Sequence, residues 1–154
     1  MVLSLKFVKR ETAMPLVRFS VPAALSAAKT RALADAVHDG LVATCAVPVK
    51  DRFHLISVFP PERMDLDPSF PDVKRTTEAS VVDILFLEGR TNAQRADLFR
   101  HIAAGAMAAG FQGDDIMIAL TENATTDWSL GYGRSYGDAH GASDELLPAS
   151  TAEK

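Results

Sequence analysis

The sequence SVVDILFLEGRTNAQRADLFRHIAAGAMAAGFQGDDIMIALT, residues 80–121, decides the fold. Six of its first eight residues, 80–87, are apolar and three of these are β-branched, which is typical of a buried strand. A second run of the same kind closes the stretch at residues 115–121. The sequence between the two runs has the apolar spacing of a helix, so the stretch predicts a strand, a helix and a strand.

The start and the buried face of this helix can be identified from its side chains. Thr91 and Gln94 fit a capping box, in which the threonine oxygen accepts from the Gln94 amide and the glutamine side chain reaches back. One helix face is lined by Leu98, Ile102, Ala106 and Ala109. Gly110 and Gly113 follow and predict the end of the helix, because glycine adopts the left-handed conformation of a C-terminal cap.

The preceding part of the chain has the same pattern. Residues 15–22, PLVRFSVP, predict a strand, and Ser26 stands where a helix would begin. The apolar face of that helix consists of Leu33, Val37, Leu41 and Cys45. Pro48 lies beyond its end, and residues 51–59 predict a second strand.

The two patterns are an internal repeat. A shift of 65 residues places Ser26 on Thr91, and a shift of 64 places Asp51 on Asp115. Each repeat is a strand, a helix and a strand, so we expect an α/β fold of two tandem β-α-β units. The helical crossover in each unit should be right-handed, as nearly all crossovers between parallel strands are. These units would form a four-stranded sheet with both helices on one face. The other face would be left bare, which predicts an oligomer.

Three segments follow from this organisation. Residues 1–14 are expected to be an extension outside the mature fold, and residues 15–137 to form the domain. Residues 138–154 are polar and rich in Gly, Ser and Asp in their first part, which predicts a disordered tail. Within the domain, four prolines between residues 60 and 76 predict a long loop that holds a small hairpin.

Composition excludes several classes of protein. The chain has 154 residues, a net charge of −4 and no basic run, so we expect no nucleic-acid partner. No run of about 18 apolar residues is present, so we expect no membrane span. A single cysteine, Cys45, excludes a disulfide framework and fits a small core residue. The N-terminus lacks the features of a signal peptide, which predicts a cytoplasmic location.

The sequence offers no pattern for a metal or a cofactor. The four histidines have no HxxxH or HxH spacing, and Cys45 has no CxxC partner. The glycines of residues 131–137 are not followed by a predicted helix, which makes them poor candidates for a phosphate loop.

Met14 and Pro15 stand at the start of the first predicted strand. If translation starts at Met14, removal of the methionine gives Pro15 a free secondary amine. An unperturbed α-amine titrates at about 7.7–8.0, and an apolar pocket would favour its neutral form, so it could act as a general base or acid. The alternative is a proline that simply opens an edge strand.

Residues 15 to about 134 resemble the tautomerase superfamily, and most of all its malonate semialdehyde decarboxylase-like members. Three segments carry the resemblance: PLVRF at 15–19, VPVKDRF at 47–53, and a C-terminal segment. That last segment holds LTEN at 120–123, DWS at 127–129 and GYGR at 131–134, and is similar to the family pattern E-N-x-x-x-D-W-S-x-G-x-G-R.

The resemblance implies a function and a set of site residues. Pro15 matches the catalytic proline, and Asp51 an aspartate that assists it. Arg90 matches an arginine that binds the substrate carboxylate, and Trp128 a wall of the pocket. Arg134 is a further candidate for substrate binding. The resemblance also implies a homotrimer, no cofactor and a small oxo-acid substrate.

One position departs from the family pattern. Glu88 stands where the decarboxylase has the first of two arginines, and a carboxylate there repels an anionic substrate. The favoured function is therefore keto–enol tautomerisation of a small 2-oxo acid. A decarboxylase or hydratase acting on a 3-oxo acid is one alternative. An inactive relative is another, if Met1 is the true start and the Pro15 nitrogen is blocked. Without the resemblance, Asp51 would be a turn-forming carboxylate.

Overall fold

The structure is a computed structural model that describes residues 14–137. The predicted disordered tail and all but the last residue of the predicted extension lie outside the described residues. The elements are β1 (Leu16–Pro22), α1 (Ala27–Cys45), β2 (Phe53–Phe59), β3 (Ser80–Leu87), α2 (Asn92–Ala108) and β4 (Ile116–Asn123), with short 3-10 turns at Pro61–Arg63, Gly113–Asp115 and Thr125–Asp127.

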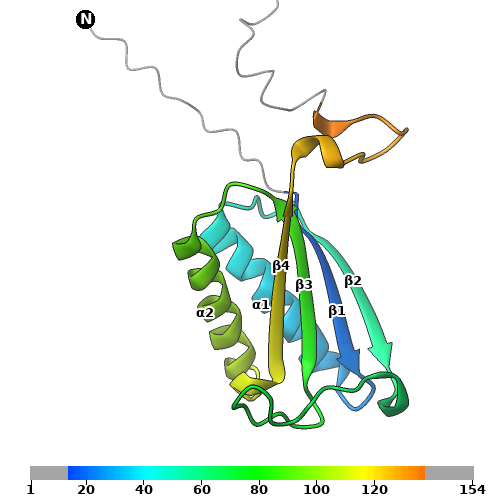
Figure 1. Cartoon of the computed structure of the whole chain (residues 1–154), viewed down its shortest axis with the longest axis vertical. Coiled ribbons are helices and arrows are strands. Elements are labelled where there is room, and N and C mark those ends of the chain that lie inside the picture. Colours follow the sequence, from blue (N-terminus) through cyan, green and yellow to red (C-terminus); the bar gives the residue numbers. More distant parts are fainter. Residues whose placement is uncertain (1–13, 138–154) are drawn as a thin grey trace, which may run out of the picture.

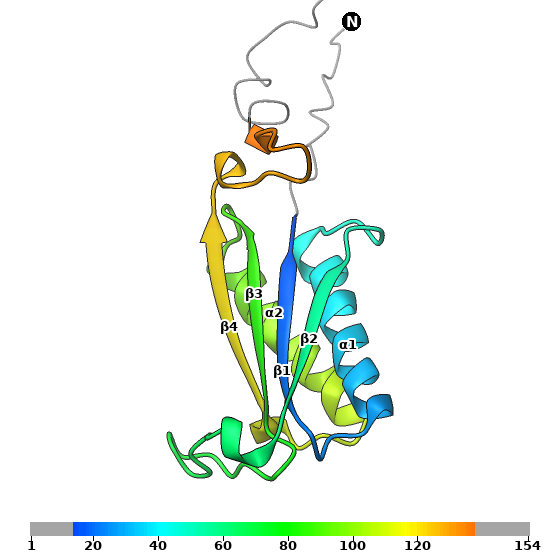
Figure 2. The same cartoon turned by 90° about the vertical axis from the view of Figure 1, so that its right-hand side faces the viewer.

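The four strands form one mixed sheet in the order β2-β1-β3-β4. β1 is parallel to β2, β3 is parallel to β4, and the two central strands, β1 and β3, are antiparallel. Both helices cover the same face of this sheet (Figures 1 and 2). The predicted fold class, with two β-α-β units side by side, is confirmed. Because β1 and β3 run in opposite directions, equivalent points of the two units lie at opposite ends of the sheet.

The core lies between the sheet and the two helices. Alternate residues of β1 and β3 face the helices and are buried, since side chains on a strand alternate between faces. They meet the predicted helix faces, and the largest fully buried side chains of the described residues include Phe19, Phe86, Leu33, Leu41, Ile84, Leu87, Leu98 and Ile102. Ser26 and Thr91 cap the two helices as predicted, and the capping box at Thr91 is complete.

The opposite face of the sheet is uncovered in the single chain. Phe53 and Leu55 on the edge strand β2 are 53% and 52% exposed, and Met117 on β4 is 39% exposed. Among residues 14–137, no helix is long and apolar enough to cross a membrane.

The structure corrects the start of one strand, the end of another and the content of one loop. β2 begins at Phe53 instead of residue 51, because the amides of Asp51 and Arg52 donate to the turn carbonyls of Pro48 and Lys50. β4 continues to Asn123, since its pairing with β3 extends beyond residue 121. The hairpin predicted within residues 60–76 is wrong: this loop holds a 3-10 turn and no strand.

Candidate active site

Pro15 is buried immediately before β1, and the residue in front of it contacts Asp51. The Met14 backbone amide donates to Oδ2 of Asp51 over 2.9 Å. Met14 has a φ of 51°, in the left-handed region that costs a residue with a side chain on the order of 1 kcal/mol. The predicted site residues Pro15 and Asp51 therefore lie close together, although they are 36 positions apart in the sequence.

The second carboxylate oxygen of Asp51 is unsatisfied. Its Oδ1 is buried and has no hydrogen-bond partner within the described part of the chain. Burial raises the pKa of Asp51, while the Met14 hydrogen bond and the charges of His38 and Arg90 oppose that rise. A carboxylate in this state can accept one more donor or exchange a proton.

Arg90 lies at the same end of the sheet. Its guanidinium donates to the carbonyl oxygens of Leu87, over 2.8 Å, and Cys45, over 3.3 Å, and its central carbon lies 5.1 Å from the centre of the Phe86 ring. These contacts fix a cation near Asp51, which feels its charge. An arginine held in this way suits recognition of a carboxylate.

Trp128 and Arg134 belong to the segment that follows β4. Trp128 donates from Nε1 to the Asn123 side-chain oxygen over 2.6 Å, and the amide of Tyr136 donates to the Trp128 carbonyl. The guanidinium of Arg134 lies 5.1 Å from the ring of Tyr132. Figure 2 shows this segment beyond the end of the sheet at which β1 begins.

This placement separates the candidates into two groups. Pro15, Asp51 and Arg90 are brought together. Within residues 14–137, no hydrogen bond joins Trp128 or Arg134 to any of those three.

Two further charged residues flank the candidate site. Arg52 forms an ion pair with Asp35 of α1, with 2.7 Å between Nη2 and Oδ1. Glu88 is exposed, and its backbone amide donates to the Asn123 carbonyl over 2.8 Å.

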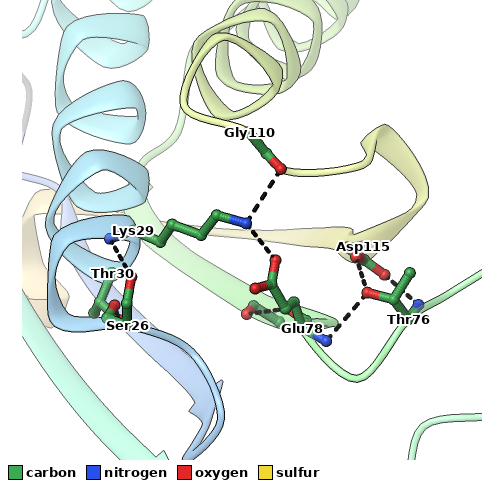
Figure 3. A network of polar contacts seen from close by, with 8 residues as sticks. Ser26, Lys29, Thr30, Thr76, Glu78, Gly110 and Asp115 are labelled. Atoms are coloured by element: carbon green, nitrogen blue, oxygen red, sulfur yellow. Dashed lines mark hydrogen bonds and ion pairs between the residues drawn. The ribbon is translucent and has the colours of Figure 1, made fainter.

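The repeat supplies an internal comparison for Asp51. Its counterpart Asp115 lies at the other end of the sheet and is 1% exposed. One oxygen of Asp115 accepts from the amide of Thr76 over 2.6 Å, and the other accepts from the Thr76 hydroxyl over 2.5 Å (Figure 3). The two turns have one hydrogen bond in common, since each aspartate amide donates to the carbonyl three residues earlier. Asp115 is thus satisfied by the fold, and Asp51 is not.

Residues 51–131, more than half of the chain, match the model of a family described as tautomerase enzyme. The chain belongs to the tautomerase family. Among curated proteins, this tautomerase-family chain is 28% identical over 123 residues to the probable tautomerase YusQ of Bacillus subtilis (strain 168). That match covers 79% of this chain and 97% of YusQ.

Solved structures extend the likeness. A malonate semialdehyde decarboxylase inhibited by 3-bromopropiolate is 30% identical to this tautomerase-family chain, with a TM-score of 0.75. The match covers 86% of this chain and 99% of that enzyme. A second one, described with decarboxylase and hydratase activities, is 25% identical with a TM-score of 0.73 and the same coverage. A fused 4-OT solved as a symmetric trimer has 20% identity and a TM-score of 0.66, over 81% of this chain and 98% of its own, and shows the fold alone.

The candidate site also contains a residue that the sequence patterns do not single out. His38 is 4% exposed, and its Nε2 lies 2.9 Å from the carbonyl oxygen of Val49, two residues before Asp51. The sequence signal that could have identified His38 is its position beside Val37, on a helix face that is otherwise apolar. Within residues 14–137, no group of three or more His, Cys, Asp or Glu side chains could hold a metal ion.

Proposed function

We propose that this protein is a tautomerase that uses the amine of an amino-terminal Pro15 for keto–enol tautomerisation of a small 2-oxo acid. The amine takes a proton from the enol hydroxyl and returns a proton to the neighbouring carbon, so no cofactor is needed. Proton transfer of this kind by a positioned group contributes roughly 10²–10⁴-fold to a rate.

The unsatisfied oxygen of Asp51 is the observation that carries the proposal. Asp51 Oδ1 has no donor among the described residues, and its Oδ2 binds the amide of Met14, the residue next to Pro15. In the form that begins at Pro15, that amide is gone and the Pro15 amine is available as a donor. The fully bonded Asp115 in the same place of the second unit argues that an unsatisfied oxygen is not a requirement of the fold.

Substrate binding is assigned mainly to Arg90. Its guanidinium supplies a fixed positive charge beside Asp51, where it can hold the carboxylate of an oxo acid. Trp128 and Arg134 are proposed as further substrate-binding groups from the segment after β4, which lies beyond the same end of the sheet (Figure 2).

A decarboxylase or hydratase acting on a 3-oxo acid is the second candidate function. The observation in its favour is the 30% identity to a malonate semialdehyde decarboxylase over 86% of this chain. In that reaction Pro15 would act as a cationic acid, whereas tautomerisation needs the neutral amine. Burial of Pro15 favours the neutral form, and the charge of Asp51 favours the cation.

Replacement of Pro15 tests the proposed function. In the chain that begins at residue 15, Pro15→Ala should lower kcat/KM towards phenylenolpyruvate by about a hundredfold or more. Unchanged turnover by the folded variant would refute the proposal. The pH dependence of the active reaction then separates the two candidates: activity that rises as the amine loses its proton indicates tautomerisation, and activity that falls indicates the cationic acid.

The mature form and its location are part of the same proposal. We propose a homotrimer that begins at Pro15 and resides in the cytoplasm, with no nucleic-acid or membrane partner. The trimeric fused 4-OT shares its fold, and the exposed apolar side chains on the uncovered face of the sheet favour self-association. If the protein from its native source retains residues 1–14, its intact mass will show this, and an inactive relative becomes the better account.

A further inference from the structure

The turn that presents Asp51 is attached to α1 through a buried imidazole. His38 is 4% exposed, and its Nε2 lies 2.9 Å from the carbonyl oxygen of Val49. A carbonyl oxygen can only accept, so the ring carries its hydrogen on Nε2. Its other nitrogen, Nδ1, is buried and has no hydrogen-bond partner within residues 14–137. Within the described part of the chain, the imidazole thus makes one hydrogen bond, and that bond is to the turn.

The hydrogen bond acts at a sensitive point of the turn. Beyond Val49, the Asp51 amide donates to Pro48 over 2.9 Å and the Arg52 amide donates to Lys50 over 3.0 Å. The side chains of Val49 and Lys50 are exposed and do not anchor the turn in the core. The Val49 carbonyl is therefore the point at which a buried group of α1 holds this turn.

The second unit shows that the fold does not need an imidazole at this position. The shift of 65 residues that aligns the sequences of the two helices pairs His38 with Ala103. The second unit still forms the equivalent turn, in which the Asp115 amide donates to Gln112 over 3.0 Å. It also buries its aspartate, Asp115. A helix, a turn and a strand of this kind therefore form with an alanine, Ala103, in the place of the histidine.

We infer that His38 is a positioning residue for Asp51: its Nε2–H···O=C bond to Val49 sets where the Asp51 carboxylate lies beside Pro15. The Asp51 carboxylate is acted on by the Met14 amide, His38 and Arg90. His38 also acts on His54, together with Arg52 and Asp35. A displacement of about 1 Å at a catalytic group can cost on the order of a hundredfold in rate, so a bond of this kind has a measurable effect.

Two variants of the chain that begins at Pro15 separate the positioning effect of His38 from the effect of its bulk. His38→Leu fills the space and removes the donor, whereas His38→Gln keeps an N–H donor at a similar reach. We expect His38→Leu to lower kcat/KM by about tenfold, and His38→Gln to stay within about threefold of the unaltered protein. His54→Gln is the matched control, because the His54 ring lies 6.1 Å from that of His38 and, among the described residues, only His38 of these two histidines bonds the turn. It should leave the rate unchanged.

A double-variant cycle tests whether His38 acts through Asp51. In an Asp51→Asn background, His38→Leu should lower kcat/KM by less than about twofold further, because the group that it positions is already lost. An undiminished further loss in that background would overturn the inference. A loss of stability without any loss of rate in the single variant would overturn it as well.

The rate measurements rest on the proposed function, and a spectroscopic measurement does not. The titration of the Asp51 carboxyl carbon, followed by NMR, should differ between His38→Leu and His38→Gln, because both variants remove the charge of His38 and only His38→Leu also releases the turn. An identical titration of Asp51 in the two variants would contradict the positioning role. Nitrogen chemical shifts of the unaltered protein should show His38 protonated on Nε2; protonation on Nδ1 alone would exclude the bond to Val49. If Asp51→Asn retains full activity, the proposed function fails while these spectra still decide the role of His38.

Discussion

Asp51 and Asp115 occupy the same place in the two repeats, yet only Asp115 has both carboxylate oxygens satisfied by the described residues. The difference predicts opposite consequences of the same substitution. Asp51→Asn should lower kcat/KM by about a hundredfold and change stability little, since it removes a proton-exchanging group. Asp115→Asn should leave kcat/KM of the folded protein unchanged and lower stability by about 1–3 kcal/mol, since it disturbs a buried hydrogen-bond pair.

Steady-state kinetics and urea unfolding of the two variants, measured side by side, check this prediction. Each variant is the control for the other, because both change one carboxylate oxygen to an amide nitrogen in the same kind of turn. Equal losses of rate in both variants would contradict the division of roles between the two aspartates.

His54 makes the stability of the fold depend on pH. Burial, then the charges of Arg52 and His38, lower its pKa from the ordinary 6.5 to about 4, against an opposing effect of Asp35. Between these two values the unfolded chain binds a proton that the folded chain does not bind. The His54 contribution therefore destabilises the fold as pH falls from about 6.5 to about 4, and it is absent above that window.

The matched variant for this prediction is His54→Gln, which cannot titrate. The drop in unfolding midpoint between pH 7 and pH 4.5 should be smaller in His54→Gln than in the unaltered protein. An identical drop in both proteins would show that His54 does not carry this pH dependence.

At the scale of elements, α1 and α2 approach each other closely at one glycine. A Cβ added at Gly105 of α2 would lie 2.8 Å from the Cβ of Ala36 on α1, which is closer than real side chains come. Gly105→Ala should therefore destabilise the protein by about 1 kcal/mol, although alanine is the better helix former. Ala36→Gly in the same chain should recover part of that loss.

The recovery is measured as a coupling free energy from urea unfolding of the two single variants and the double variant. We expect a favourable coupling of at least about 0.5 kcal/mol, because the two positions share one contact. Strictly additive effects would mean that the helices move apart at no cost.

The elements themselves could be predicted because their signals are local. Apolar residues at four-residue spacing identify the buried faces of both helices, and Ser26 and Thr91 identify their starts through side chains that bond the next turn. The start of β2 could not be placed in this way, because the bonds that hold Asp51 and Arg52 in a turn are made by backbone groups that carry no sequence pattern.

The candidate site could be predicted only in part for a related reason. Pro15, Asp51 and Arg90 meet because each lies where an element begins or ends, and the sheet order brings those ends together. His38 was missed because a histidine on an apolar helix face is usually a core residue. The segment with Trp128 and Arg134 has no periodicity, so its sequence gives no direction for either side chain.

At the scale of the whole molecule, the uncovered sheet face predicts assembly. Leu55 lies on this face in the edge strand β2 and is 52% exposed in the single chain. We expect the protein to sediment with the mass of three chains, and Leu55→Glu to shift it towards one chain, because burial of a carboxylate in an apolar contact is costly. Phe99→Glu on α2, where the side chain is 38% exposed, is the matched control and should leave the mass unchanged. A single-chain mass for the unaltered protein would contradict the prediction.

The approximate two-fold arrangement of the two units gives the sheet two similar ends but only one with a proline amine. The central claim is that catalysis depends on that amine, and the most direct test compares two forms of the protein whose intact masses have been verified. One begins at Pro15, and the other retains residues 1–14, so its Pro15 nitrogen is an amide without basicity. We predict that turnover of phenylenolpyruvate is confined to the form that begins at Pro15. Equal turnover by both forms would contradict the account.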